Sequence, residues 1–487
     1  MFKKLILSLI ALICFSGLAV AQDDSEDLPY NIKTGFTFML NPQGFDEDLP
    51  FWMHVNRDGR IDQNSANALH YFEGYTQIYK NSIFEVEAGA SFISRDYADS
   101  QLSYFDKGYL NLHIYDFKFM AGRFIDPLAM KEDELSTGSF MYSRNATPIP
   151  KIAFSTDGFV GVPGTNNIVR YNGLFAHGWF ENDRYVKNAY LHEKYFYLSI
   201  KYAFFDAVGG IVHNVQWSGE SQSRGQLPTG WQTFWEVITA SGSSDETAPG
   251  GEQSNAVGNS VAAYDFSLGL YFDNFDMRAY RLFYLEDKVS TRFRSPWDGI
   301  WGLTIKPKNN SLIRNIIWEH INTKRMDSYD FEPRGTASYY NNGIYRTGWT
   351  YEGRVIGNPM LLTDGTIERP VYNNIIIAHH LGLSGSLGNN VNYKMLYTFS
   401  RNYGEVQDQI ITSLPREECP GTGGRVCAEL RPLEELKKVN HSVMLNFSST
   451  LPQNKRWSYG VNLSADLGEL YGDRIGLGVN IEYQLTK

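Results

Sequence analysis

Long apolar runs are missing from most of this 487-residue chain, and their absence excludes a bundle of transmembrane helices. After residue 22, no uninterrupted apolar stretch approaches the ~20 residues that a spanning helix needs. Basic residues are also few: 44 lysines and arginines stand against 54 acidic residues, which argues against a surface built to bind nucleic acid. With 43% hydrophobic and 15% aromatic residues, the chain is still too apolar to be disordered.

Cysteine is rare, with three residues in the whole chain. Cys14 lies in the N-terminal leader, and Cys419 and Cys427 remain as a pair. In an exported protein such a pair favours a disulfide within a loop over two free thiols. Neither a C-x-x-C motif nor histidines at ligand spacing accompany the pair, so no metal site is predicted.

Motifs of common hydrolases and of cofactor-dependent enzymes are also absent. The run Gly382–Ser386 departs from the G-x-S-x-G pattern, and His192-Glu193 lacks the second histidine of the zinc proteases. No P-loop or dinucleotide fingerprint occurs, so we predict neither an enzyme nor a cofactor. A hydrolase whose site is assembled from separate loops stays a weaker alternative.

The N-terminus has the three parts of a secretory signal peptide. Lys3 and Lys4 supply the positive region, residues 5–20 are apolar, and Ala19-Val20-Ala21 forms a small-x-small cleavage site. We predict a signal peptide over residues 1–21 and a short acidic periplasmic tail over residues 22–29. Export of this kind is compatible with the outer membrane of a Gram-negative bacterium.

Polar and apolar residues alternate with period two in many segments, including 84–92, 391–400, 457–466 and 475–485. Successive side chains of a strand point to opposite faces, so these segments are predicted strands with one apolar and one polar face. A soluble β-sandwich and a transmembrane β-barrel both produce this pattern. The predicted strands run ~9–11 residues or more, which suits a tilted membrane strand better than a typical soluble one.

The connections between these strands alternate between short and long. Barrels of the outer membrane have short periplasmic turns and longer outer loops, whereas a sandwich has no reason to keep this order. We therefore predict an all-β fold, a transmembrane antiparallel barrel of about eighteen strands over residues 30–487, with both termini in the periplasm. Its first strand is Tyr30 to Leu40, and short helices are expected in the outer loops, near 127–136 and 432–439. The longest extracellular loops are predicted at 217–260, 322–374 and 401–440.

Two strands break the alternation. Arg281 falls on the apolar side of its strand, and residues 312–321 carry Arg314, Glu319 and His320 without regular spacing. An Arg facing lipid at the midplane costs ~2–4 kcal/mol. We expect these charges near a rim, in the lumen beside a bulge, or paired with each other.

The loop over residues 335–359 is the richest in candidate binding residues. Aromatic residues alternate there with Asn, Arg and Gly, in a segment too long for a plain connection. Flat rings suit the C–H faces of sugars, and amides and guanidinium groups suit their hydroxyls. The predicted glycan contacts are Tyr339, Tyr340, Asn341, Asn342, Tyr345, Trp349 and Arg354. Alternatively, the aromatic rings pack the folded loop or form the outer aromatic girdle, and the same two interpretations apply to Trp217, Trp231 and Trp235.

Several stretches resemble the capsule-assembly Wzi family in its Bacteroidetes-type branch. They are Trp297–Gly302, Ile316–His320, Tyr339–Pro359, Gly178-Trp179 and Leu191–Lys194. The resemblance implies an eighteen-stranded outer-membrane barrel that acts as a lectin, binding capsular polysaccharide at the cell surface and assisting capsule assembly or anchoring.

The partners expected from this resemblance are capsular or extracellular polysaccharide, outer-membrane lipid and the polysaccharide export machinery, with the barrel as a monomer. The alternative function is a saccharide or small-solute porin, since eighteen strands can leave an aqueous channel. Family members carry periplasmic helices that help to plug the lumen, whereas only a short tail precedes Tyr30 here. The sequence therefore leaves the state of the lumen open.

Overall fold

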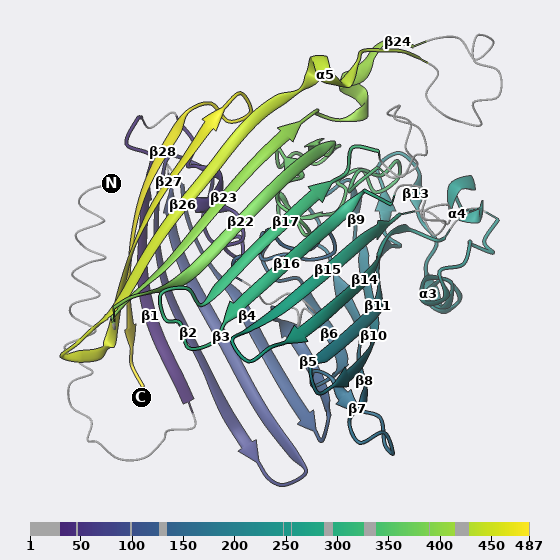
Figure 1. The fold of residues 1–487 in the computed structure, drawn as a ribbon. Helices are drawn as coiled ribbons and strands as arrows, with labels where there is room; N and C mark the ends of the chain where they lie inside the picture. Colours follow the sequence, from purple (N-terminus) through teal and green to yellow (C-terminus); the bar gives the residue numbers. More distant parts are fainter. Residues whose placement is uncertain are drawn as a thin grey trace.

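The protein is a closed antiparallel β-barrel of 18 strands, seen from the side in Figure 1. The structure, a computed structural model, describes residues 30–44, 47–97, 100–125, 134–246, 248–254, 256–286, 296–325, 338–388, 390–413 and 428–486. The barrel strands are β1 (Tyr30–Leu40), β2 (Ala66–Lys80), β3 (Phe84–Tyr97), β4 (Ser100–Ile114), β5 (Phe117–Arg123), β6 (Pro150–Thr156), β8 (Val169–Trp179), β10 (Tyr190–Tyr202), β11 (Phe205–Trp217), β14 (Asn259–Tyr271), β15 (Phe275–Leu285), β16 (Gly299–Pro307), β17 (Asn315–Asn322), β22 (Ile376–Leu387), β23 (Val391–Asn402), β26 (Lys438–Leu451), β27 (Asn454–Gly468) and β28 (Arg474–Gln484). Each strand pairs with its neighbours in this order, and β1 pairs with β28 to close the cylinder, with Phe36 opposite Ile481.

Shorter elements lie in the connections. The helices are α2 (Phe51–His54), α3 (Gly230–Thr239), α4 (Gly250–Ser254), α5 (Leu433–Leu436) and the 3-10 turn η2 (Val406–Gln409). Small strands are β7 (Val160–Gly161), which pairs with β8, and β9 (Val186–Lys187), β12 (Glu220–Ser221), β13 (Gly225–Gln226), β18 (Thr350–Tyr351), β19 (Arg354–Val355), β20 (Leu362–Thr363), β21 (Val371–Asn373), β24 (Ile410–Ser413) and β25 (Ala428–Leu430). Among the described residues, no helix is both long and apolar enough to cross a membrane.

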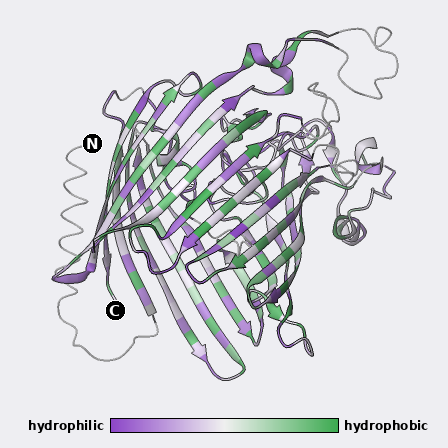
Figure 2. Ribbon diagram, viewed as in Figure 1, coloured by the Kyte–Doolittle hydropathy of each residue, from purple (hydrophilic) through white to green (hydrophobic). Residues whose placement is uncertain are grey.

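Exposure along the strands distinguishes the barrel from a sandwich. On β27 the apolar side chains of Tyr459, Val461 and Leu463 are exposed, while Asn462 and Ser464 between them are buried. A soluble sandwich would bury the apolar set instead. Figure 2 shows hydrophobic and hydrophilic positions alternating along the strands. The period-two pattern is therefore that of a lipid-facing exterior and a polar lumen.

The predicted alternation of the connections is confirmed for most links, with exceptions at the two-position link between β3 and β4 on the long-loop side and the longer link 157–168 on the short-turn side. At one end, which we name the short-turn rim, the links are brief, as at 81–83, 115–116, 203–204, 272–274 and 388–390. At the other end, the long-loop rim, the links include 41–65, 124–149, 218–258, 323–375 and 403–437. The first strand begins and the last strand ends at the short-turn rim, because β1 and β28 pair antiparallel.

Long loops fold back into the lumen and fill it near the long-loop rim. We call this body the plug and define it by α2 and the described residues of 134–149 and 338–375. Its core includes Phe140, Met141 and Trp349, which are buried. The plug is bonded to the barrel wall: the buried Glu319 carboxylate of β17 accepts hydrogen bonds from the Ser136 hydroxyl and from the Thr137 backbone N–H, each at 2.7 Å. The lumen that the sequence left open is thus plugged by the protein's own long loops.

The irregular strands are explained by their position. Arg281 lies at the long-loop end of β15, where its guanidinium sits 4.4 Å from the centre of the Trp301 ring and donates to the carbonyl oxygens of Leu282 and Pro296. The predicted strand 312–321 starts later, because residues 308–314 form a turn and β17 begins at Asn315. Glu319 faces the lumen, as its bonds to the plug show.

Two helix predictions have different outcomes. A helix is present near 432–439 but shorter, because α5 ends at Leu436 and β26 begins at Lys438. Most of the predicted helix at 127–136 lies outside the described residues, as do residues 1–29 and the Cys419–Cys427 pair.

Candidate functional site

The predicted glycan-binding residues come together in the plug, most of them inside it. The side chains of Tyr339, Tyr340, Tyr345 and Trp349 are almost completely buried, and Asn341 is buried as well. The remaining two candidates, Asn342 and Arg354, are partly exposed. The Arg354 guanidinium donates to the carbonyl oxygens of His54 and Ile61, so Arg354 and the five buried residues support the surface from below, and Asn342 lies at its edge.

Hydrogen bonds explain how so many polar rings can be buried. The Tyr340 hydroxyl donates to the Phe140 carbonyl oxygen and accepts the Asn358 backbone N–H, both at 2.8 Å. The Trp349 indole N–H donates to the Met141 carbonyl oxygen at 3.0 Å. The Tyr345 hydroxyl donates to the Ser218 carbonyl oxygen at 3.2 Å. Two of these bonds join the loop 323–375 to the link 124–149, one joins it to the link 218–258, and one lies within the loop, so these side chains hold the plug together.

Backbone geometry at the start of this segment is unusual. Tyr339 and Tyr340 have φ values of 38° and 81°, in the left-handed region that residues with side chains rarely adopt. The Tyr339 ring stacks on Tyr284 of β15, with centroids 4.5 Å apart. Packing and the two hydrogen bonds of Tyr340 stabilise a conformation that would be costly in a free loop.

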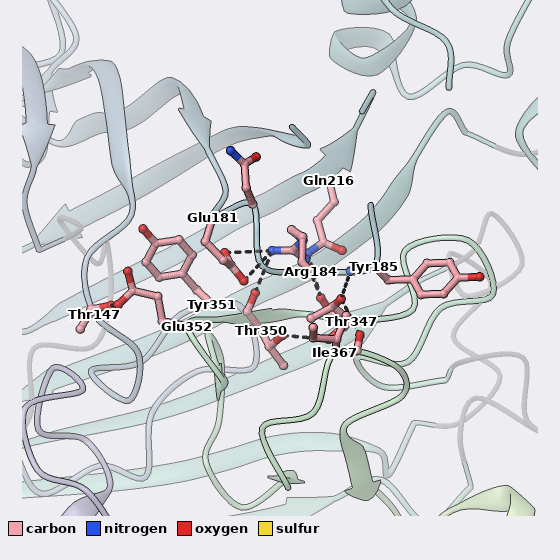
Figure 3. A network of polar contacts seen from close by, with 12 residues as sticks. Thr147, Glu181, Arg184, Tyr185, Gln216, Thr347, Thr350, Tyr351, Glu352 and Ile367 are labelled. Atoms are coloured by element: carbon pink, nitrogen blue, oxygen red, sulfur yellow. Dashed lines mark hydrogen bonds and ion pairs between the residues drawn. The ribbon is translucent and has the colours of Figure 1, made fainter. Parts of the chain in front are cut away.

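A second polar network lies where the plug meets the loop 180–189 at the long-loop rim, shown in Figure 3. The buried Arg184 guanidinium forms an ion pair with Glu181 at 3.2 Å and donates to the carbonyl oxygens of Gly348 and Thr350, each at 3.4 Å. The Tyr185 backbone N–H donates to the Thr347 hydroxyl at 2.8 Å. Arg184 therefore fixes the outer edge of the plug to a neighbouring loop.

Next to this network is a group of polar side chains in which Glu352 is exposed, Arg123 and Glu181 are partly exposed, and Thr147 and Tyr351 are buried. The Glu352 carboxylate, which is exposed, accepts the Thr147 hydroxyl at 2.9 Å and lies 3.8 Å from the Arg123 guanidinium. Arg123 also donates to the Tyr351 hydroxyl at 3.2 Å. We define the rim site as Arg123, Thr147, Glu181, Tyr351 and Glu352.

The rim site offers both acceptors and donors to a ligand. Burial raises the pKa of the Glu181 carboxyl, although the Arg184 guanidinium beside it lowers that pKa. Glu352 presents carboxylate oxygens and Arg123 presents guanidinium N–H groups at the same edge. Sugar hydroxyls both donate and accept hydrogen bonds, so a glycan chain matches this combination.

Sequence reasoning missed most of the rim site. Its residues come from the end of β5 and from three different loops, and no local motif marks them. The only local signal was the Gly353-Arg354 pair next to Glu352 in the candidate loop. Among the described residues, no group of three or more histidine, cysteine, aspartate or glutamate side chains could hold a metal ion.

The described residues line two sizeable cavities inside the barrel. One of about 670 Å³ lies toward the short-turn rim, between the plug residue Ser136 and wall residues such as Tyr271 and Asp276. The other, of about 590 Å³, lies beside α2 and includes Arg57 and Arg144. The plug therefore leaves space with polar lining residues both beside it and toward the short-turn rim.

These features define the class of protein: an outer-membrane β-barrel whose lumen is occupied by its own long loops. The family model described as capsule assembly protein Wzi matches residues 45–361, more than half of the chain, and the chain belongs to this family.

Solved structures agree with this assignment. Wzi of Escherichia coli, described as an outer-membrane protein involved in group 1 capsule assembly and as a carbohydrate-binding β-barrel, matches with a TM-score of 0.57 and 12% identity. The match covers 94% of this chain and 85% of that chain. OccK5 (OpdH) of Pseudomonas aeruginosa matches with a TM-score of 0.47 and 8% identity over 94% of this chain and 98% of that chain, too low to support an argument. A comparison with curated proteins gives no significant match.

Proposed function

We propose that this protein binds capsular or other extracellular polysaccharide at its long-loop rim and thereby assists capsule assembly or anchoring. The observation that carries the proposal is the plug. It converts long loops into a buried scaffold and leaves Glu352 exposed and Arg123, Glu181 and Asn342 partly exposed at the rim. Family membership and the carbohydrate-binding description of Escherichia coli Wzi support the same function.

The proposal includes a location and an orientation. Residues 1–21 are removed as a signal peptide, residues 22–29 stay in the periplasm, and the long-loop rim faces the cell exterior. Cys419 and Cys427 form a disulfide, which peptide mapping without reductant would detect. The protein acts by binding and catalyses no reaction. It works as a monomer, and the export machinery is a further candidate partner.

The binding test uses full-length protein purified in detergent and a glycan array that includes the producer's own capsular polysaccharide. Glu352→Gln is expected to weaken retention of that glycan about tenfold, since a charged hydrogen-bond acceptor is lost. The matched control is Asp273→Asn, an exposed carboxylate in the short turn 272–274 at the opposite rim. No retained glycan, together with a firmly attached capsule in a deletion strain, would contradict the proposal.

The alternative function, a porin, is favoured by the two luminal cavities. Its test is conductance in planar bilayers. A plugged barrel should show no steady open current, whereas a stable open pore would favour the porin. The binding and conductance experiments are independent, so each function can fail on its own.

A further inference from the structure

The segment 218–258 folds on the outside of the barrel instead of inside it. Figure 1 shows α3 beside the outer wall next to β11 and β14. The Phe234 ring of α3 packs against outward-facing rings of three strands, with centroids 6.0 Å from His177, 5.9 Å from His192 and 5.8 Å from Trp217. The Lys194 ammonium of β10 donates to the carbonyl oxygens of Val237 and Ile238, at 3.3 and 2.7 Å, and so caps the C-terminal end of α3.

α3 is amphipathic, and only part of its apolar face meets the wall. Val237 is buried, while Trp231 and Trp235 are 71% and 50% exposed. On strand β10, the outward residues that follow Lys194 are Phe196, Leu198 and Ile200, all exposed and apolar. The helix therefore lies at the upper border of the lipid-facing surface, where tryptophan is enriched in membrane proteins.

A groove of about 1010 Å³ runs between this segment and the wall. Its lower part is lined by Phe196 and Ile211, which are 50% and 44% exposed on the lipid-facing surface, and by Tyr264. Its upper part reaches Asn342 at the edge of the plug. The groove thus connects the acyl-chain region with the polar rim.

Glu252 of α4 lines this groove and is 2% exposed. Among the described residues, no side chain donates a hydrogen bond to its carboxylate oxygens, although the Gly258 backbone N–H interacts with them. Burial raises the pKa of the Glu252 carboxyl to about 7, against the opposing effects of the Gly258 backbone N–H and Arg224. A buried carboxyl with so few donors is unfavourable, and a ligand with hydroxyl donors would relieve that cost.

We propose that this groove binds the lipid A part of lipopolysaccharide from the outer leaflet. The acyl chains enter along Phe196 and Ile211, and Glu252 accepts a hydroxyl of the sugar head. Lys194, which also lines the groove, supplies a cation for a lipid phosphate. The inference goes beyond polysaccharide binding and rests only on the proposed outward orientation of the long-loop rim.

The test titrates detergent-purified, full-length protein with labelled rough-type lipopolysaccharide, and in parallel with labelled phosphatidylethanolamine. Ala262→Trp fills the groove from β14, where Ala262 lines it. Ala279→Trp makes the same change at an exposed position of β15 that is absent from the groove lining. Heat-modifiable migration in gels verifies that both variants are folded.

We expect wild type and Ala279→Trp to bind rough lipopolysaccharide equally, Ala262→Trp at least tenfold more weakly, and Glu252→Gln a few-fold more weakly. Binding to the capsular glycan should be unchanged in Ala262→Trp, which separates this inference from the proposed function. Equal lipopolysaccharide binding by the two tryptophan variants would overturn the proposal. The proposal would also be overturned if the wild type bound phosphatidylethanolamine as tightly as rough lipopolysaccharide, because the groove would then take any acyl chain.

Discussion

Two long loops of this barrel carry the same kind of sequence and fold to opposite sides of the wall. The loop 323–375 turns into the lumen and buries its aromatic residues, whereas the segment 218–258 lies on the outer wall and exposes Trp231 and Trp235. The two loops differ in where the polar atoms of their aromatic side chains find hydrogen-bond partners. Inside, the hydroxyl and indole groups find backbone carbonyls on other loops, as Trp349 does at Met141. Outside, the rings border lipid, where an amphipathic side chain can keep its polar atom in water.

This contrast shows that aromatic residues among Asn and Gly do not by themselves mark a binding surface. In the inner loop they form a core, and in the outer segment Trp231 and Trp235 stay exposed. Substitutions in the two regions should therefore have effects of different size and on different properties of the protein.

The largest effect is expected at the centre of the plug. Trp349→Ala removes a fully buried ring and its hydrogen bond, and such changes cost ~3–5 kcal/mol. The plug should loosen, which lowers the thermal unfolding midpoint and produces intermittent current in planar bilayers. Trp231→Ala on the outer helix is the matched control. Identical unfolding midpoints for the two variants would show that the inner loop is not a core.

The second effect concerns pH and the outer segment. The pKa of Glu252 in the folded protein, about 7, lies above the 4.5 of an ordinary glutamate, so the docked segment binds more protons than the released one between these values. Docking is therefore firmest below about pH 4.5, weakens as pH rises, and has lost this contribution above pH 7, on the order of 3 kcal/mol at most. The inner loop should show no matching change.

Hydrogen exchange measures this difference. Amides of α3 and α4, corrected for intrinsic rates, should be better protected at pH 5 than at pH 8. Glu252→Gln should remove the pH dependence, and Glu246→Gln, at an exposed carboxylate of the same segment, should keep it. Equal protection at both pH values in the wild type would count against a buried, protonated Glu252.

A single hydroxyl gives the third effect. Tyr340→Phe leaves the Asn358 N–H and the Phe140 carbonyl oxygen without their partner inside the plug, at a cost of ~1–3 kcal/mol. Tyr372→Phe, at an exposed ring of the same loop, should change stability by less than ~0.5 kcal/mol. Thermal unfolding in detergent compares the two variants. Equal unfolding midpoints would mean that the Tyr340 hydroxyl is bonded to water in the folded as well as in the unfolded protein.

Much of the barrel was predictable because strand periodicity and loop length are local properties. The first strand, Tyr30 to Leu40, coincides with β1, and short turns alternate with long loops at most connections of the cylinder. The start of β17 was placed three residues too early, because Leu312 and Ile313 are apolar like strand residues but belong to the link 308–314. Helix α3 was not predicted, since ten residues within a loop give a weak periodic signal.

The site was predictable only as a region. Composition identified the loop that contains Tyr339 and Trp349, but whether a ring is buried depends on carbonyls supplied by residues about two hundred positions away, such as Phe140 and Met141. Long-range contacts of this kind leave no mark in a single sequence. The rim site was missed for the same reason, because Glu352 meets Thr147 and Arg123 only after the plug has formed.

The smallest effect on stability is expected for the exposed tryptophans of α3. Trp231→Phe combined with Trp235→Phe should change the unfolding free energy by less than ~0.5 kcal/mol, since neither ring is buried in the protein. The same double variant should lose much of the fluorescence that is quenched by lipids brominated near the head of the acyl chain. If the two tryptophans contact lipid, the double variant will show less quenching by brominated lipids and an unchanged unfolding free energy. If instead the double variant unfolded as early as Trp349→Ala, α3 would have to be a stabilising part of the barrel, and the inner and outer loops would differ only in location.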